Sequence, residues 1–291
     1  PCREEKPGLK TELNKLSFLF FTILISYELN AQIPINGFCK LNSHDVKTNY
    51  NSIFSLNYNN DSYTDLVLFN ENFRNYSLIT GNGNDEIINE KLFLSPFELS
   101  QLASNYGSGN RLINYAYTSR KNRQAGFMSI SASGKLLTNL SFKFDSFPEN
   151  ISAADVNAAG FSELLISGNG FDGLSILHHE HGKLNEIKLE KRKVFSEAVF
   201  VDLSNDGLKD IAAFNLLNNS INFYYNYSSL RFNTVRSIKT ESPIHNLKTY
   251  NMNLDSYEDL LYSQQKTLKI MYGDAISSYS SIVTVSTEYI P

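Results

Sequence analysis

Short apolar runs separated by polar segments recur along the chain between Ser52 and Glu288. They are rich in branched and aromatic residues and too short for helices, so they predict strands. One set comprises Leu66–Phe69, Leu164–Ile166, Ile211–Phe214 and Leu260–Tyr262, and another apolar run precedes each of these, such as Ile53–Phe54 or Val199–Val201. Further runs follow at similar spacing and alternate apolar with polar residues, as a half-buried strand does. These further runs are 76–79, 127–130, 174–177, 221–224 and 268–271, followed by 184–187, 232–235 and 282–285.

A ten-residue segment rich in Asp and Asn lies between the first two predicted strands of each unit. Oxygen-bearing side chains occupy places 1, 3, 5 and 9 of this segment in three copies, which begin at Asn57, Asp202 and Asn251. A degenerate copy begins at Asp155 and has lost the oxygen at place 5. Polar segments of this kind predict loops that join two strands.

The copies recur at a nearly constant interval. The fifth places Ala159, Asp206 and Asp255 lie 47 and 49 residues apart, and Asp61 precedes Ala159 by 98 residues, about twice that step. We therefore expect a further unit in the gap, around residues 105–113, where the carboxylates are lost. A period in this range is typical of repeat architectures.

Four strands in each unit of about fifty residues predict an all-β fold, a β-propeller of four-stranded antiparallel blades with five blades visible. The expected blades are 52–95, 99–145, 150–190, 195–240 and 244–290, within a propeller domain of residues 33–291. Because an open ring would expose strand edges, we expect residues 35–41 to pair with the last blade. A fragment of a larger ring is the alternative.

The repeated motif, Asp/Asn-x-Asn/Ser-x-Asp-Gly/Ser-x-x-Asp-Leu/Ile between two apolar strands, resembles the FG-GAP or VCBS repeat. Such repeats occur in integrin α-chain propellers and in secreted bacterial proteins, and the resemblance covers Ser52 to Glu288. The sequence departs from the family because the Phe-Gly and Gly-Ala-Pro words are absent, and Ser62 and Ser256 replace the glycine at place 6. The resemblance implies an adhesion scaffold that binds an extracellular protein or a glycan.

The acidic segments carry the ligand types that calcium prefers. Ca²⁺ takes six to eight oxygen ligands at about 2.3–2.6 Å, and a tight loop can supply them from places 1, 3 and 5, the carbonyl of place 7 and the carboxylate of place 9. Gly207, at place 6, allows a left-handed backbone turn around the ion. The predicted calcium ligands are Asp202, Ser204, Asp206, Leu208 and Asp210 in one loop, Asn57, Asn59, Asp61, Tyr63 and Asp65 in another, and Asn251, Asn253, Asp255, Tyr257 and Asp259 in the third.

The alternative for these segments is a hydrogen-bonded turn without metal, because Asp and Asn side chains can bond backbone amides two residues further on. Ligand charge ranks the copies, and the loop of Asp206 leads with three carboxylates. The degenerate copy with Asp155, Asn157 and Glu163 is expected to be a turn.

Residues 1–32 form a predicted leader. Lys10 and Lys15 precede an apolar stretch from Leu16 to Tyr27, and Ala31 before Gln32 offers a cleavage junction, as in a bacterial secretory signal. The apolar stretch is shorter than the ~20 residues that span a bilayer, so no membrane insertion is expected after cleavage. We expect a secreted or cell-surface monomer.

Composition and the remaining polar clusters add little chemistry. A net charge of −4 with dispersed acidic residues gives no nucleic-acid footprint, and two cysteines, one of them in the leader, exclude a disulfide framework. The cluster His178–His181 is expected to be an exposed hairpin end.

No catalytic set can be proposed from spacing, so a binding protein is favoured. The alternative is a propeller-type polysaccharide lyase or hydrolase, or a fragment of one, which a pocket lined by Tyr and His over the central channel would favour.

Overall fold

The structure is a computed structural model that describes residues 46, 49–59, 61–82, 89–104 and 114–286. The chain divides into two compact units, Pro1–Ser43 and His44–Pro291, and every described residue belongs to the second. The predicted leader and the segment 35–41, expected to close the ring, lie outside the described residues. Within the described ranges, no helix is long and apolar enough to cross a bilayer.

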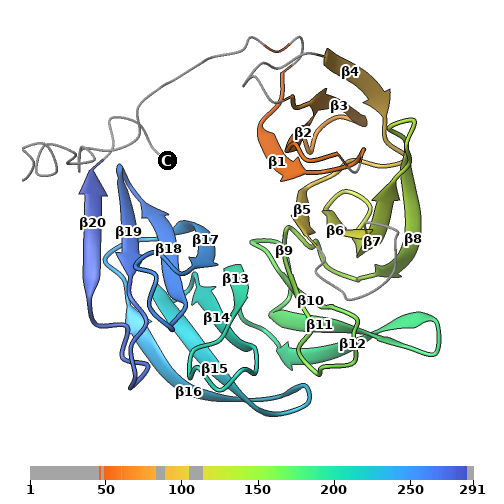
Figure 1. Cartoon of the computed structure of the whole chain (residues 1–291). Helices are drawn as coiled ribbons and strands as arrows, with labels where there is room; N and C mark the ends of the chain where they lie inside the picture. The colour runs from red at the N-terminus through yellow and green to blue at the C-terminus, as the bar shows by residue number, and fades with distance from the viewer. Residues whose placement is uncertain (1–45, 47–48, 60, 83–88, 105–113, 287–291) are drawn as a thin grey trace, which may run out of the picture. The chain divides into compact units, whose positions relative to one another are not determined.

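Five four-stranded antiparallel sheets form the blades of a β-propeller, numbered here in chain order (Figure 1). Blade 1 contains β1 (Ser52–Leu56), β2 (Asp65–Phe69), β3 (Asn75–Thr80) and β4 (Asn89–Leu94). Blade 2 contains β5 (Gln101–Ser104), β6 (Asn114–Ser119), β7 (Gln124–Ile130) and β8 (Leu136–Lys143). Blade 3 contains β9 (Asn150–Ala154), β10 (Glu163–Ser167), β11 (Leu174–Glu180) and β12 (Lys183–Glu190).

Blade 4 contains β13 (Phe195–Val201), β14 (Asp210–Asn215), β15 (Ser220–Ser228) and β16 (Arg231–Lys239). Blade 5 contains β17 (His245–Tyr250), β18 (Asp259–Gln264), β19 (Thr267–Met271) and β20 (Ile282–Ser286). Consecutive strands pair within every blade. The all-β class, the four-stranded blades and the number of five confirm the fold predicted from the sequence. The second blade forms as the 98-residue gap predicts, although residues 105–113 of its first loop lie outside the described ranges.

The first strand of each blade lies nearest the centre of the propeller (Figure 1). Side chains of these inner strands bond the backbone of the next inner strand along. Gln101 Oε1 of β5 accepts the N–H of Ile151 in β9 at 2.6 Å, and Ser152 Oγ of β9 accepts the N–H of Phe200 in β13 at 3.1 Å. Polar residues on the inner strands therefore hold neighbouring blades together around a central channel.

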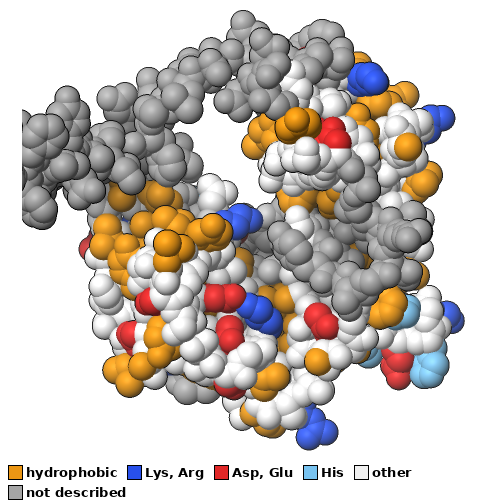
Figure 2. Space-filling view, in the orientation of Figure 1, with side chains coloured by type: hydrophobic (Ala, Val, Ile, Leu, Met, Phe, Trp, Pro, Cys, Tyr) orange, Lys and Arg blue, Asp and Glu red, His pale blue; other side chains and the backbone are white. Residues whose placement is uncertain are grey.

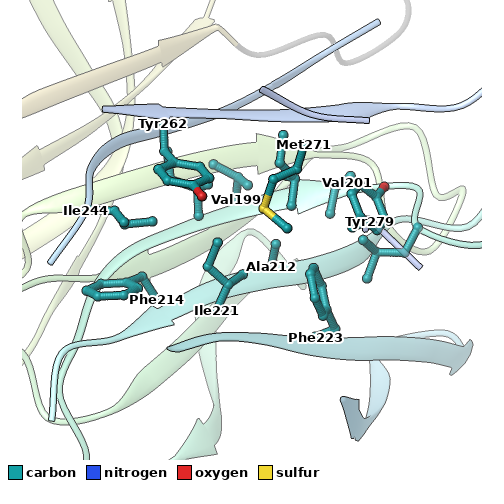
Figure 3. Close-up of a cluster of buried hydrophobic side chains, with 13 residues drawn as sticks. Val199, Val201, Ala212, Phe214, Ile221, Phe223, Ile244, Tyr262, Met271 and Tyr279 are labelled. Carbon is teal, nitrogen blue, oxygen red and sulfur yellow. The ribbon is translucent and has the colours of Figure 1, made fainter. Parts of the chain in front are cut away.

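Apolar side chains fill the space between neighbouring blades. Alternate residues of a strand point to opposite faces, so a central strand can contribute to two cores. In β14, Ala212 and Phe214 pack in the cluster shared with blade 5, whereas Ile211 and Ala213 pack in the cluster shared with blade 3. Figure 3 shows the former cluster, in which Met271 of β19 lies opposite the side chains of β14 and β15. Burial of apolar surface at about 25 cal/mol per Å² makes these cores the main stabilising contacts between blades.

Strand direction places the loops. Neighbouring antiparallel strands run in opposite directions, so the loops after the first and third strands of a blade lie at one end, and the loop after the second strand lies at the other. All acidic segments follow first strands and share one face of the propeller, which we call the acidic-loop face. The opposite face carries the β2–β3 and β14–β15 turns, with Phe73 and Leu217 exposed.

Candidate functional site

Place 9 of each described acidic loop is a buried carboxylate. In Asp65, Asp210 and Asp259, one carboxylate oxygen accepts the backbone N–H of place 2, and the other accepts an N–H at the end of the third strand. The place 2 donors are Tyr58 (3.1 Å), Leu203 (3.0 Å) and Met252 (2.6 Å), and the third-strand donors are Gly81 (3.0 Å), Asn226 (2.7 Å) and Gly273 (2.9 Å). The carboxylate thus fixes the loop to its own blade, whether or not it also binds a cation.

Acidic loops 3 and 4, numbered by blade, begin with Asp and have glycine at place 6. In loop 4, Asp202 accepts the N–H of Asp206 at 3.2 Å and the N–H of Gly207 at 2.9 Å. Gly207 has φ +85°, so the left-handed turn predicted from the sequence is confirmed. Asn205, at place 4, is also left-handed, with φ +57°, a conformation that asparagine tolerates better than most residues.

Acidic loops 1 and 5 begin with Asn and have serine at place 6, and they form a different turn. In loop 1, Asn57 Nδ2 donates to the carbonyl of Asp61, and Asn59 Nδ2 donates to Asp61 Oδ2 at 2.7 Å. Asp61 Oδ1 accepts the N–H of Tyr63 at 2.7 Å. Loop 5 repeats these three bonds with Asn251, Asn253, Asp255 and Tyr257. Neither Ser62 nor Ser256 has a positive φ, which explains why these loops do not need the glycine of the family motif.

One oxygen in each of loops 1 and 5 is buried and has no hydrogen-bond partner among the described residues. These oxygens are Asn57 Oδ1 and Asn251 Oδ1, both at place 1. A buried acceptor without a partner costs about 1–3 kcal/mol, and a cation would satisfy it. Hydrogen bonds from the amide nitrogens of places 1 and 3 to place 5 bring these residues together. Their side chains carry the hard oxygen atoms that calcium takes as ligands.

Loop 4 contains three carboxylates that influence one another. Burial raises the pKa of Asp210 to about 6, the N–H bonds from Asn226 and Leu203 oppose this, and the charges of Asp206 and Asp202 raise it further. Ser204 is exposed on the same loop. Across the described part of the chain, no three His, Cys, Asp or Glu side chains gather into a metal-holding group. A calcium ion here would therefore need hydroxyl and carbonyl oxygens in addition to carboxylates.

Acidic loop 3 is closed by its own hydrogen bonds. Glu163 Oε2 accepts the N–H of Val156 at 2.8 Å, and Glu163 Oε1 accepts Asn157 Nδ2 at 2.8 Å. Asp155 accepts the N–H groups of Ala159 and Gly160, at 3.1 and 2.9 Å. Burial raises the pKa of Glu163 to about 7. These contacts form the hydrogen-bonded turn expected for the degenerate copy.

Place 7 of every described acidic loop is a large apolar or aromatic residue. Tyr63, Phe161 and Leu208 are 43%, 51% and 37% exposed, and Tyr257 is half-buried. The ring of Phe161 lies 4.9 Å from that of His179. The histidine cluster matches the expected exposed turn only at His181, because His178 and His179 are half-buried residues of β11. Further exposed apolar residues flank loops 4 and 5 on this face, namely Tyr227, Tyr250, Met252, Leu254 and Ile276. Figure 2 shows hydrophobic side chains grouped over blade 5.

A cavity of about 700 Å³ occupies the central channel. All five inner strands contribute to its wall. The residues that line it are Asn51, Ser52, Ile53, Phe54, Ser55, Phe69, Ser100, Gln101, Leu102, Ala103, Ser104, Asn150, Ile151, Ser152, Ala153, Val199, Asn246, Lys248 and Thr249. Tyrosine and histidine do not occur among these lining residues.

No family model matches the chain, and no curated protein matches it. Solved structures do match the chain. A lectin from Agrocybe aegerita, described by its specific recognition of non-reducing terminal N-acetylglucosamine, has a TM-score of 0.55 at 12% identity, over 81% of this chain and 66% of that chain. A protein from Lactobacillus plantarum has a TM-score of 0.53 at 16% identity, over 77% of this chain and 68% of that chain. This chain thus spans about two thirds of the length of each, and the likeness shows the propeller fold alone.

Two features of the site were not predicted from the sequence. Tyr63, Leu208 and Tyr257 were predicted as calcium ligands through their carbonyls only, and no role was predicted for Phe161. A signal was present, because place 7 is apolar or aromatic in every one of these copies. The second feature is Glu258 of loop 5, whose carboxylate accepts the backbone N–H of Asp202 in loop 4. The sequence gives no signal for this bond, since a single Glu on a loop resembles any solvated residue.

Proposed function

We propose that this chain is a secreted calcium-binding propeller of the FG-GAP/VCBS type that binds an extracellular protein or glycan through its acidic-loop face. The observation that carries the proposal is the exposure of Tyr63, Phe161 and Leu208 at the same place of three loops on that face. Loops on a rigid scaffold are the usual place for binding residues, and exposed apolar groups bordered by polar ones mark interaction sites.

Aromatic side chains suit either class of ligand. Tyrosine is enriched among the residues that dominate binding energy at protein interfaces. The flat rings of Tyr63 and Phe161 also offer surfaces on which the apolar face of a sugar ring can pack. The similarity to the Agrocybe aegerita lectin agrees with a glycan ligand in fold only.

The loops that display these residues are held in place by buried bonds. Each place 9 carboxylate joins its loop to the blade, as Asp65 does through Tyr58 and Gly81. Loops fixed before binding lose less conformational entropy when the ligand arrives, which raises affinity. Calcium in loops 1, 4 and 5 would add to this by satisfying Asn57 Oδ1 and Asn251 Oδ1 and by offsetting the repulsion among the carboxylates of loop 4.

Export would follow from the predicted leader. An extracellular location supplies the millimolar calcium that loops with few carboxylates need, since weak extracellular sites have dissociation constants of about 10⁻⁴–10⁻³ M. The central cavity favours binding over polysaccharide cleavage, because the described part of its lining contains none of the Tyr or His residues that would favour a lyase or hydrolase.

The experiment is to probe the purified protein on a glycan array and on a panel of extracellular matrix proteins, in millimolar calcium and in EDTA. We expect a restricted set of ligands that is bound in calcium and lost or weakened in EDTA. Absence of binding to both panels in calcium would contradict the proposed function. Binding that is equal in calcium and EDTA would contradict the role of calcium.

A further inference from the structure

The cavity in the central channel is separate from the acidic-loop surface and has its own chemistry. Its volume of about 700 Å³ lies within the range of roughly 300–1,000 Å³ typical of small-molecule sites. Hydroxyl and amide side chains make up most of its polar wall. Such groups both donate and accept hydrogen bonds, so they suit a ligand rich in hydroxyl groups.

One part of the wall is apolar. Ile53 of β1 is 65% exposed in this wall, whereas the side chains of Leu102, Ile151 and Val199 are buried in the cores between the blades. A pyranose ring has an apolar face of C–H groups and a polar rim of hydroxyls. Ile53 can pack on the apolar face of such a ring, and the hydroxyl and amide groups of the wall can bond its polar rim.

Among the described residues that line the cavity, one has a charged side chain, Lys248 of β17. Lys248 is exposed, and no described carboxylate lies within ion-pair distance of its ammonium. Burial raises the pKa of Glu197, and the charge of Lys248 partly opposes this rise. Glu197 Oε1 accepts the backbone N–H of Asn246 at 3.2 Å, so this neighbouring carboxylate is held by the inner strands. The ammonium is thus placed to bind an anionic group of a ligand in the channel.

We propose that the central channel is a binding site for a sugar acid, a pyranose whose ring packs on the wall around Ile53 and whose carboxylate is bound by Lys248. The hydroxyl groups of the sugar bond exposed polar side chains of the wall such as Asn51 and Ser55, since Gln101 and Ser152 already bond neighbouring strands. This site does not depend on the acidic-loop face or on calcium.

The test compares D-galacturonate with D-galactose, which differ only in a carboxylate in place of a hydroxymethyl group. Binding is measured by isothermal titration and by saturation-transfer NMR in EDTA. We expect galacturonate to bind at least about tenfold more tightly than galactose. We also expect 0.5 M NaCl to remove most of this difference, since screening weakens an exposed ion pair.

Three variants locate the site. Lys248→Met should lower the affinity for galacturonate about tenfold, to the level of galactose, and leave galactose unchanged. Lys183→Met, an exposed lysine at the start of β12, is the matched control and should change neither. Ser55→Trp, at an exposed position of β1 in the cavity wall, should abolish binding of both sugars while the melting temperature stays within a few degrees.

The proposal is overturned if galacturonate does not bind, if it binds no better than galactose, if Lys248→Met has no effect, or if Ser55→Trp still binds. These failures leave the array result of the proposed function unaffected. If no ligand of the array or the protein panel is bound in calcium and galacturonate still binds specifically, the proposed function is overturned and the channel site is supported.

Discussion

The carboxylate of Glu258 in acidic loop 5 accepts the backbone N–H of Asp202, the first residue of acidic loop 4, at 2.7 Å. Glu258 also forms an ion pair with Lys209 of loop 4, and its carbonyl accepts the hydroxyl of Tyr279 at 2.7 Å. One residue therefore connects the loops of two neighbouring blades beside the exposed side chains of the acidic-loop face.

Replacement of Glu258 by alanine should separate the two loops. Because Asp202 N–H loses a charged acceptor, we expect the free energy of unfolding to fall by about 1–2 kcal/mol. Hydrogen exchange at the Asp202 amide should accelerate. Glu241→Ala is the control, since the side chain of Glu241 is 88% exposed and such surface pairs contribute little. Unchanged exchange at Asp202 in Glu258→Ala would show that this bond does not hold loop 4.

Calcium should stabilise the fold. Loop 4 carries three carboxylates, and loops 1 and 5 each contain a buried oxygen without a partner, so an empty site is costly. At a hundredfold excess over the dissociation constant, linkage gives about 2.7 kcal/mol for one site. Thermal melting in millimolar calcium and in EDTA should then differ by several degrees. Superimposable melting curves would contradict calcium binding by these loops.

Ligand charge should rank the loops. Asp206→Ala removes one of three carboxylates from loop 4, so we expect it to remove more bound calcium than Asp61→Ala or Asp255→Ala. Asn157→Ala, in the hydrogen-bonded loop 3, should remove none. The stoichiometry of bound calcium, by titration or native mass spectrometry, is the measurement. Equal losses from all four variants would show that the ranking by carboxylates is wrong.

Glu163 should make stability depend on pH. Burial raises its pKa from an ordinary value of 4.5 to about 7, so the folded protein binds this proton more tightly than the unfolded chain does. The free energy of unfolding should therefore fall as the pH rises from about 4.5 to about 7, by about 1–3 kcal/mol. Urea unfolding at pH 5 and pH 8 in EDTA measures this fall. Glu163→Gln should reduce it, the exposed control Glu180→Gln should not, and an equal fall in wild type and Glu163→Gln would contradict the assignment.

The fold was predictable because the sequence repeats it. The interval between Ala159, Asp206 and Asp255 gives the number of blades, and the continuous apolar run Ile211–Phe214 predicts a strand, which the structure buries on both faces. The hidden second blade followed from the same interval.

The chemistry of the loops was predictable only in part. Sequence shows that Asp65 and Asp210 carry oxygen at place 9, but not that both oxygens of each accept backbone N–H groups, because the third strand that supplies one donor is distant along the chain. The difference between Asp-first and Asn-first loops was visible as Gly207 against Ser62. That these residues mark two different turns is seen only from the hydrogen bonds of the structure. The channel arises from five inner strands brought together by the ring, and no local pattern predicts its lining.

The proposed function requires that the acidic-loop face bind its ligand through the place 7 side chains. The most direct test compares array binding in calcium by the wild type, by a Tyr63→Ser, Phe161→Ser, Leu208→Ser triple variant, and by a Phe73→Ser, Leu217→Ser variant of the opposite face. All five side chains are exposed, so little stability should be lost in either variant. We predict that the triple variant loses at least about 30-fold in affinity, or ~2 kcal/mol, as expected for residues that dominate an interface, while the opposite-face variant binds like the wild type. Wild-type binding by the triple variant, or loss only in the opposite-face variant, would contradict the account.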